Sequence, residues 1–258
     1  MPFTVSHAAA VLPFRKLNLV WSAFIIGSMA PDFPYVIGND MYRGFGHRFP
    51  GILGFTIPAA LFALWMFHNV IKRPIVGMLP IGMQLRLQSE LRPFPFSGIK
   101  RFTAILVSIV IGIATHVVWD SLTHSYTWAY YHLSWLRGSV HVPFVGVMPV
   151  VAALQYGSSV LGMVALALWV LLWYRNTPEP QLRFNAVPKS HFFLAVTMFA
   201  IAGMVALIRA FVVVGMPALR ANASHFLMVF AVTAIAVAFW QLLLYCVMVS
   251  THQVWIIP

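Results

Sequence analysis

The sequence predicts an all-α integral membrane protein with about six transmembrane helices and a short re-entrant or interfacial N-terminal segment. Of its 258 residues, 61% are hydrophobic and only 8% are charged. A water-soluble domain of this length carries a far larger share of charged residues, so the composition indicates a chain that lies in a bilayer. The net charge of +11 is spread between apolar runs rather than massed in one patch. This favours membrane lipid, and not nucleic acid, as the partner of the basic loops.

Apolar runs with almost no charged residues mark the expected spans, each of which needs about 20 residues to cross a bilayer. They lie, in order, at residues 17–30, 51–71, 102–119, 142–174, 190–216 and 224–249. The first is short and imitates a signal peptide, but we expect an uncleaved span because Asp32 follows it at once. The fourth is long enough for a short buried segment and a full span, with a break near residues 155–157.

We expect these spans to form a single membrane domain over residues 1–258. Residues 1–165 carry the motifs described below, and residues 190–250 add two further transmembrane helices.

The distribution of basic residues predicts the orientation. Eleven of them lie before the first span, between the second and third, and after the fourth. Placing these in the cytoplasm satisfies the positive-inside rule with six spans and both termini inside. Several polar residues then fall near the outer face: Asp32, His47, Asp120, His124, His132 and His141. His7 reaches that face only if the N-terminal segment folds back into the membrane, or if the basic residues after it lie in a pocket lined by protein.

One apolar run carries polar residues at helical spacing. His116, Asp120 and His124 follow one another at intervals of four, so on a helix they would form a single polar ridge. Only five acids serve the whole chain, and another of them, Asp32, follows Pro31 just after the first expected span. A carboxylate at membrane depth is costly and usually marks a functional site.

These residue types suit a divalent metal ion. Zinc takes imidazole nitrogen and carboxylate oxygen, and a catalytic site leaves one position open for water. Four residues form a plausible shell for one ion: Asp32, His47, His116 and Asp120. A bridging carboxylate and two further histidines could bind a second: Asp120, His7 and His124. Two alternatives are an imidazole–carboxylate hydrogen bond that only satisfies both groups in the bilayer, and a proton relay in a transporter.

Other motifs have simpler explanations. Three histidines lie near the expected inner boundary and are not expected to be ligands: His68, His191 and His252. The aromatic cluster at residues 126–131 is typical of an interfacial belt. Residues 157–159 are typical of close helix packing. The linker at residues 71–100, with its prolines and basic residues, is expected to lie along an anionic lipid surface.

Four motifs together resemble a bacterial membrane family, the domain of unknown function numbered 4184. They are MPFTVSHAAA at residues 1–10, GSMAPDF at 27–33, HVVWDSLTH at 116–124 and QYGSSVLG at 155–162. The resemblance runs from the N-terminus to about residue 165. It implies a multi-pass protein of the bacterial inner (cytoplasmic) membrane. More distantly, the chain is similar to membrane-bound metal-dependent hydrolases of the YdjM type, whose motifs match in order His7, Pro31-Asp32, His47-Arg48 and His116/Asp120/Thr123.

A remoter similarity, to the zinc-dependent phospholipase C and P1 nuclease group, implies how the ligands are shared. It implies a first ion in a shell of Asp32, His47, His116 and Asp120, with Asp120 bridging to a second ion held by His7. Those soluble enzymes also use a later His-x-x-x-Glu/Asp motif. Here Val145 stands four residues after His141, which leaves no counterpart for a third ion.

The leading functional prediction is a metal-dependent hydrolase of a phosphoester on a lipid or lipid-linked substrate, with zinc as the expected ion. Asp120 and His124 are the candidate catalytic residues. Arg48 and Arg137 are expected to bind phosphate, since a guanidinium binds phosphate through two parallel hydrogen bonds.

The alternative is a non-enzymatic membrane protein, a metal or proton transporter that lines its path with the same residues. Such a path needs polar groups continuing to the inner face, and only Ser108 lies between Thr103 and Thr115. A packing or assembly protein without chemistry would explain the spans but not the clustered acids. The sequence does not specify the oligomeric state.

Overall fold

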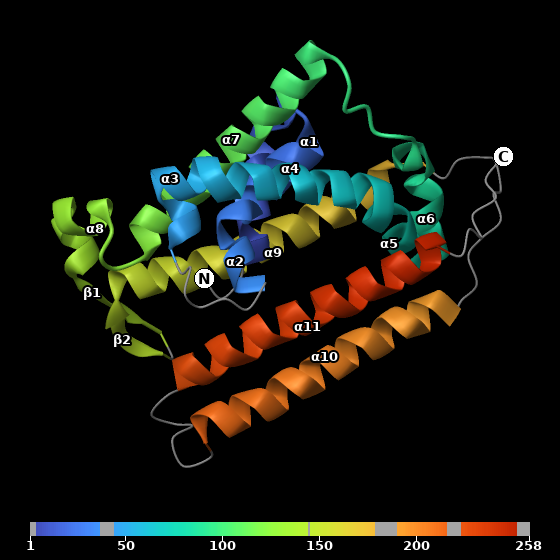
Figure 1. Cartoon of the computed structure of the whole chain (residues 1–258). Helices are drawn as coiled ribbons and strands as arrows, with labels where there is room; N and C mark the ends of the chain where they lie inside the picture. The colour runs from blue at the N-terminus through green and yellow to red at the C-terminus, as the bar shows by residue number, and fades with distance from the viewer. Residues whose placement is uncertain (1–3, 37–43, 144, 179–189, 216–222, 252–258) are drawn as a thin grey trace. The chain divides into compact units, whose positions relative to one another are not determined.

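The computed structural model describes residues 4–36, 44–143, 145–178, 190–215 and 223–251, and Figure 1 shows the chain coloured along its length. The residues group into two compact units. The first comprises Met1–Pro34, Asp40–Phe62 and Phe96–Trp169. The second comprises Tyr35–Asn39, Ala63–Pro95 and Val170–Pro258. Most of the motif-bearing part of the sequence therefore falls in the first unit.

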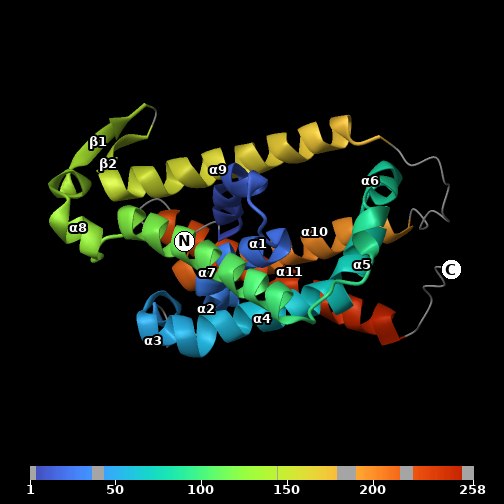
Figure 2. The same ribbon diagram turned by 90° about the horizontal axis from the view of Figure 1, so that it is seen from above.

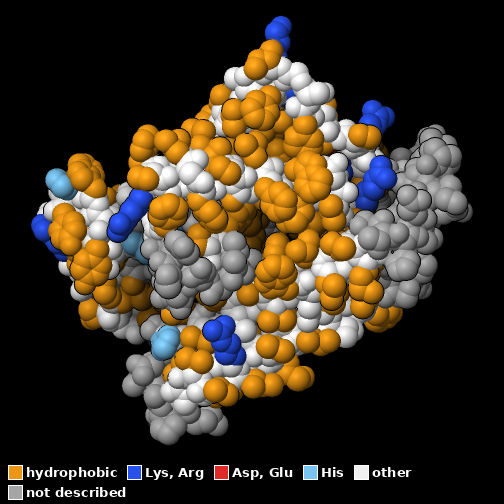
Figure 3. Space-filling view, in the orientation of Figure 1, with side chains coloured by type: hydrophobic (Ala, Val, Ile, Leu, Met, Phe, Trp, Pro, Cys, Tyr) orange, Lys and Arg blue, Asp and Glu red, His pale blue; other side chains and the backbone are white. Residues whose placement is uncertain are grey.

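Five helices in the described residues are long and apolar enough to cross a membrane: Phe49–Met78, Ile99–Thr123, Val150–Asn176, Phe192–Val214 and His225–Val249. They correspond to the second to sixth spans expected from the sequence, and they indicate a membrane protein. Apolar side chains also dominate the face of the molecule shown in Figure 3, on which Lys and Arg stand as isolated groups. Such a surface suits contact with lipid.

The predicted first span does not form one long helix. Residues 17–30 contain only the nine-residue helix α1 (Trp21–Met29), which continues as the 3₁₀ turn η2 (Ala30–Asp32) and the short helix α2 (Phe33–Val36). Pro31 and Pro34 lack the backbone N–H that a long α-helix requires. The α-helix is therefore interrupted there by a tighter 3₁₀ turn. Before α1, the N-terminal residues form a 3₁₀ helix, η1 (Thr4–Lys16).

The remaining elements of the first unit follow in chain order. They are η4 (Phe45–His47), α3 (Phe49–Gly51), the π-helical turn η5 (Ile52–Thr56), α4 (Ile57–Met66), α7 (Ile99–Thr123), α8 (Trp128–His132), η8 (Ser134–Arg137), β1 (Ser139–Val142), β2 (Gly146–Pro149) and α9 (Val150–Asn176). Helix α4 passes into the second unit after Phe62, and α9 does so after Trp169.

Helix α1 packs directly on α7, as Figures 1 and 2 both show. A Cβ atom on Gly27 would meet the backbone of Ile109, and one on Gly112 would meet the backbone of Phe24. Neither position has room for a side chain, in the manner of small-residue contacts between membrane helices. The contact brings the C-terminal end of α1 beside the turn of α7 that follows Gly112, where His116 lies.

The fourth expected span differs from the prediction in two ways. Its start is a hairpin in which β1 and β2 pair antiparallel, with Val140 opposite Met148, so the protein is not wholly α-helical. The predicted break at residues 155–157 is wrong, because α9 is continuous from Val150 to Asn176. A glycine costs only about 1 kcal/mol in a helix, whereas a broken helix in lipid would leave backbone groups unpaired. Close packing occurs at Ser159, which is buried, and at Gly162, where a Cβ would meet Ser6.

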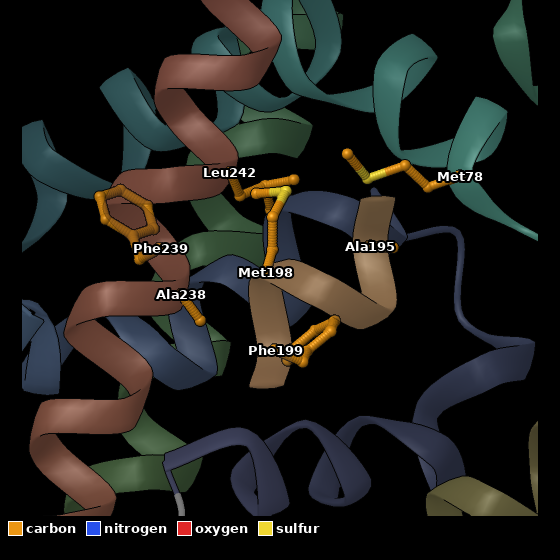
Figure 4. Close-up of a pocket in the computed structure, with 7 residues that line it drawn as sticks. All are labelled: Met78, Ala195, Met198, Phe199, Ala238, Phe239 and Leu242. Carbon is orange, nitrogen blue, oxygen red and sulfur yellow. The ribbon is translucent and has the colours of Figure 1, made fainter. Parts of the chain in front are cut away.

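The second unit contains the end of α4, the π-helical turn η6 (Phe67–Ile71), α5 (Lys72–Met78), α6 (Ile81–Arg86), η7 (Gln88–Leu91), the end of α9, α10 (Ser190–Val214) and α11 (Ala223–Thr251). Helices α10 and α11 lie side by side (Figure 1). With α5 they line a small apolar cavity of about 180 Å³ (Figure 4).

The structure revises the predicted surface linker at residues 71–100. Its first part continues the second spanning helix through α5 to Met78. Lys72 is buried, and its Nζ donates to the backbone oxygen of Arg92 at 2.9 Å. This side chain therefore packs inside the protein and is not presented to lipid.

Candidate metal centre

Polar side chains from four separate segments meet in the first unit. His7 comes from η1, Asp32 from η2, His47 from η4, and the last turns of α7 supply His116 and Asp120. Two histidines and a carboxylate from distant parts of the sequence thus lie beside the helical His116–Asp120 pair. Asp32 and His116 are fully buried in this arrangement.

Four of these residues present ligand atoms to one point. Asp32, His47, His116 and Asp120 each offer one atom, and all four atoms lie within 4.8 Å of one another. The two imidazole Nε2 atoms are 3.1 Å apart. Asp120 Oδ2 is 3.4 Å from each of them, and Asp32 Oδ1 is 3.6 and 3.7 Å away. This is the same set of four that the sequence predicted as a shell for one ion.

These separations match a coordination shell. Two ligands bound to a tetrahedral ion at about 2.0–2.1 Å lie about 3.3 Å from each other. Five of the six distances between these ligand atoms, 3.1 to 3.7 Å, fall around that value. The residues therefore fit one divalent ion, although the geometry does not identify the metal.

Two buried carboxylate oxygen atoms also suit a bound cation. Within the described part of the chain, Asp32 Oδ1 and Asp120 Oδ1 are buried and accept no hydrogen bond. A buried carboxylate oxygen without a donor is costly in free energy. A bound ion would remove that cost at Asp32, because its Oδ1 is the atom directed at the two imidazoles.

A backbone carbonyl sets the orientation of His116. Its Nδ1 lies 2.7 Å from the backbone oxygen of Ser28. Because a carbonyl oxygen only accepts, Nδ1 must carry the hydrogen, which leaves the Nε2 lone pair facing the cluster. The close contact between α1 and α7 places Ser28 in position for this hydrogen bond.

Thr4 plays a similar part for Asp32. Its hydroxyl donates to Asp32 Oδ2 at 2.7 Å, which leaves Oδ1 directed at His47 and His116. No role for Thr4 was predicted from the sequence. The spacing of Thr4 and His7 could have indicated a shared role, because residues three apart lie on one face of a 3₁₀ helix.

The hydroxyl of Thr4 should matter for metal binding. We expect Thr4→Val to weaken divalent-ion affinity by about 10–100-fold, because partners that orient a ligand contribute that much. Thr4→Ser keeps the hydroxyl and should retain most of the affinity. Titration of the purified, metal-stripped variants would measure both constants, and equal affinities for Val and Ser would show that the hydrogen bond is not needed.

His47 is held by the turn that precedes α3. The chain enters the turn through Gly44, whose φ of +78° is disfavoured for other residues. Gly46 lies against the backbone of Pro31, and its carbonyl accepts a hydrogen bond of 3.0 Å from Thr56. The short turn is therefore fixed to the same segment that carries Asp32.

His7 reaches the cluster, because η1 packs on α1 and α7. Its ring stacks on His116 with centroids 3.9 Å apart, and its Nε2 lies 3.4 Å from Asp120 Oδ1. Asp120 therefore has Oδ2 toward the four-residue site and Oδ1 toward His7, an orientation that suits a bridging carboxylate.

His124 lies at the rim of the site. Its Nδ1 is 3.8 Å from Asp120 Oδ2 but closer, at 3.2 Å, to the backbone oxygen of Asp120, to which it donates. Its Nε2 is 3.4 Å from the side-chain amide of Gln155. In this orientation the nitrogen nearest the carboxylate carries hydrogen, so the ligand role of His124 stays a prediction.

The other predicted residues are not among the four that converge. Arg48 and Arg137 have exposed side chains. His132 stacks on Trp128, and His141 is exposed on β1. His68, in the second unit, stacks on Phe94. The side chains of His191 and His252 lie outside the described residues.

Comparison with known proteins supports the family suggested by the motifs. A family model described as "Domain of unknown function (DUF4184)" matches residues 1–247. The match continues through the last two spans, so the expected limit near residue 165 is too short. No curated protein and no solved structure matches the chain.

Proposed function

The chain belongs to the DUF4184 family. We propose that it is a membrane-embedded, metal-dependent hydrolase of a phosphoester carried by a lipid or a lipid-linked molecule. The observation that carries the proposal is the convergence of Asp32, His47, His116 and Asp120 on one point. Zinc is the proposed ion, because it takes both imidazole nitrogen and carboxylate oxygen.

Each residue has a defined task in this proposal. The four converging residues would hold the first ion, and Asp120 with His7 would hold a second. Ions in such a site supply a water-derived nucleophile near neutral pH and offset charge on the phosphoryl oxygens. His124, at the rim, exchanges a proton with the substrate or leaving group. Arg48 and Arg137 bind the phosphate.

The buried face of α7 supports an enzyme over a transporter. A transport path would need polar groups from the cluster toward the N-terminal end of α7. The buried residues there are Ile105, Ser108, Ile109, Gly112 and Ile113. The one hydroxyl among them is already used, since Ser108 accepts from Val20 N at 2.9 Å and donates to Ala104 O at 2.6 Å. This arrangement favours a site that opens on one side only.

Hydrolysis can be tested directly on bilayers. Vesicles containing the purified protein would be offered a lipid phosphomonoester, a phosphodiester and a polyprenyl diphosphate, and released phosphate would be measured. We expect release from at least one of them, loss on chelation, and recovery with zinc. A protein that keeps its ion but hydrolyses none of them, and instead moves zinc or protons across the vesicle membrane, would contradict the proposal and support the transporter.

The proposed placement is a bacterial inner membrane, with both termini in the cytoplasm and the metal site near the outer face. In this topology η1 re-enters the membrane, and the helical segment Trp21–Val36 completes a sixth crossing. Support comes from the basic residues between the second and third spans, which suit the cytoplasmic side.

Cysteine accessibility would test this topology. In a Cys246→Ala background, single cysteines at Gln84 and Ser139 should react with membrane-impermeant reagents from opposite sides of the membrane. Gln84 lies in α6 and Ser139 in β1, with one spanning helix, α7, between them. Labelling of both from the same side would rule out the six-span arrangement.

A further inference from the structure

The segment at residues 124–149 joins two candidate membrane spans, α7 and α9. Both of its ends are therefore fixed at the ends of membrane-crossing helices, and a chain between such ends lies at a membrane surface. It is not an irregular loop, because it contains α8, η8 and the hairpin of β1 and β2. Below, these residues are called the cap.

The cap has a small core of its own. Ala129 and Leu136 are buried with Val151 at the start of α9, and several partly buried apolar side chains surround them: Leu122, Tyr130, Leu133, Val150 and Leu154. Since these residues already fill the interior, the side chains left outside are exposed because of the fold, and not because the cap is unpacked.

Large aromatic rings make up much of the outer surface. Tyr126 is 82% exposed and Trp128 is 72% exposed, while Tyr131 and Trp135 are both more than half exposed. A surface that faced bulk water would not normally gather four such rings on so short a segment. Trp and Tyr instead concentrate where lipid headgroups meet water, because the ring is apolar and its N–H or O–H end is polar.

The backbone at Tyr126 is held in a conformation that exposes its ring. Its φ is +68°, the one positive value at a non-glycine residue within the described residues. Such a conformation is strained for a tyrosine. Thr127 stabilises it, since its hydroxyl donates to Ser121 O at 2.6 Å and accepts from Tyr130 N at 3.2 Å.

Charge on the cap also suits lipid phosphate. Residues 124–149 contain no acid, and the exposed polar side chains include Arg137, His132 and His141. An aromatic surface with basic and neutral polar groups is complementary to a layer of phosphate headgroups. We propose that Tyr126, Trp128, Tyr131 and Trp135 form an aromatic collar that inserts into the lipid headgroup region of the leaflet next to the metal centre.

The collar lies beside the open side of that centre. Side-chain exposure rises from 0% at His116 to 21% at His47 and 34% at His124. The most exposed of these side chains, His124, is two residues from Tyr126 in the chain, so the exposed rim of the site adjoins the collar segment. The consequence for substrate rests on the proposed function: a phosphoester of a membrane lipid, already at headgroup depth, meets the ions without leaving the bilayer.

Depth measurements on spin-labelled protein would test the collar. In a Cys246→Ala background, single cysteines at residues 128, 131 and 135 would carry nitroxides, and the protein would be placed in phospholipid vesicles. Leu168, exposed on α9, gives the hydrocarbon reference, and a soluble nitroxide gives the water reference. We expect the ratio of oxygen to nickel-chelate accessibility at all three sites to lie between the references, several-fold above the water value.

Two results would overturn the collar. Ratios equal to the soluble nitroxide would place the rings in water. Spin–spin broadening that disappears on dilution with unlabelled protein would show that a second copy of the chain covers them. These readouts require neither metal nor hydrolysis, so the collar can fail while the proposed function holds. Asp120→Asn should remove the ion without changing the three depths. The metal site can therefore fail while the collar holds, and the two proposals are tested separately.

Discussion

Asp120→Asn should empty the metal centre while leaving the membrane helices in place. Asp120 supplies Oδ2 to the four-residue site and Oδ1 to His7, so its loss affects both proposed ions. An amide has no charge to balance a cation and retains one oxygen at most. We expect the divalent-ion affinity to fall at least about 100-fold, and the purified protein to lose its ion, because loss of a ligand should exceed the 10–100-fold cost of losing a partner that orients one.

The matched control is Glu90→Gln, which makes the same chemical change at an acid in the second unit, on η7. It should keep the parent ion content. Both variants would be purified in detergent, checked for helicity and monodispersity, and analysed for metals. Retention of the parent amount of ion by Asp120→Asn, with a folded protein, would show that Asp120 only takes part in helix packing.

His116→Ala and His47→Ala should also cause a large loss of bound divalent ion. Their Nε2 atoms face each other at 3.1 Å, and each is 3.4 Å from Asp120 Oδ2. Removing either deletes a bond to the ion and disturbs the geometry of the others.

His7→Ala should remove the second ion and leave the first, so it should lower the metal content to about half, provided both sites are filled.

The control for these variants is His68→Ala. His68 is also a partly buried histidine stacked on an aromatic ring, but it lies in the second unit beside Phe94. Its loss should affect local packing only. His191→Ala and His252→Ala are predicted from the sequence to behave in the same way. Equal loss of metal in the two groups of variants would contradict the assignment of ligands.

Part of the site could be predicted because helical spacing is visible in a sequence. The interval of four between His116 and Asp120 fixes them on one face, and the cost of a carboxylate in an apolar chain singled out Asp32. His47 was predicted from a motif and not from helical spacing, because only the folded turn against Pro31 brings it to α7.

What the sequence did not reveal depends on the folded backbone. The backbone carbonyl of Ser28 orients His116. Because every residue has a backbone carbonyl, this role could not be predicted from the residue type. Thr4 was missed because its partner, Asp32, is 28 positions away. The predicted break in α9 was wrong for a different reason. A glycine favours a break in a helix in water, but it is tolerated in lipid, where every backbone group must keep its hydrogen bond.

The hairpin and the short first helix show a further limit. Hydropathy marks where the chain is apolar, but it does not distinguish a strand from the start of a helix at residues 139–149. Likewise, it placed a span at residues 17–30 although the prolines at 31 and 34 change the helix type just beyond. Hydropathy therefore located the five long helices well and the irregular segments around the site poorly.

The metal content of the parent protein tests the central claim most directly. The protein would be expressed with metal-replete growth, purified without chelator, and analysed for divalent ions per chain alongside Asp120→Asn. One tightly bound ion per chain, or two if the His7 site is also filled, is the predicted result, with zinc as the expected metal. A folded parent protein that holds no more ion than Asp120→Asn would contradict it.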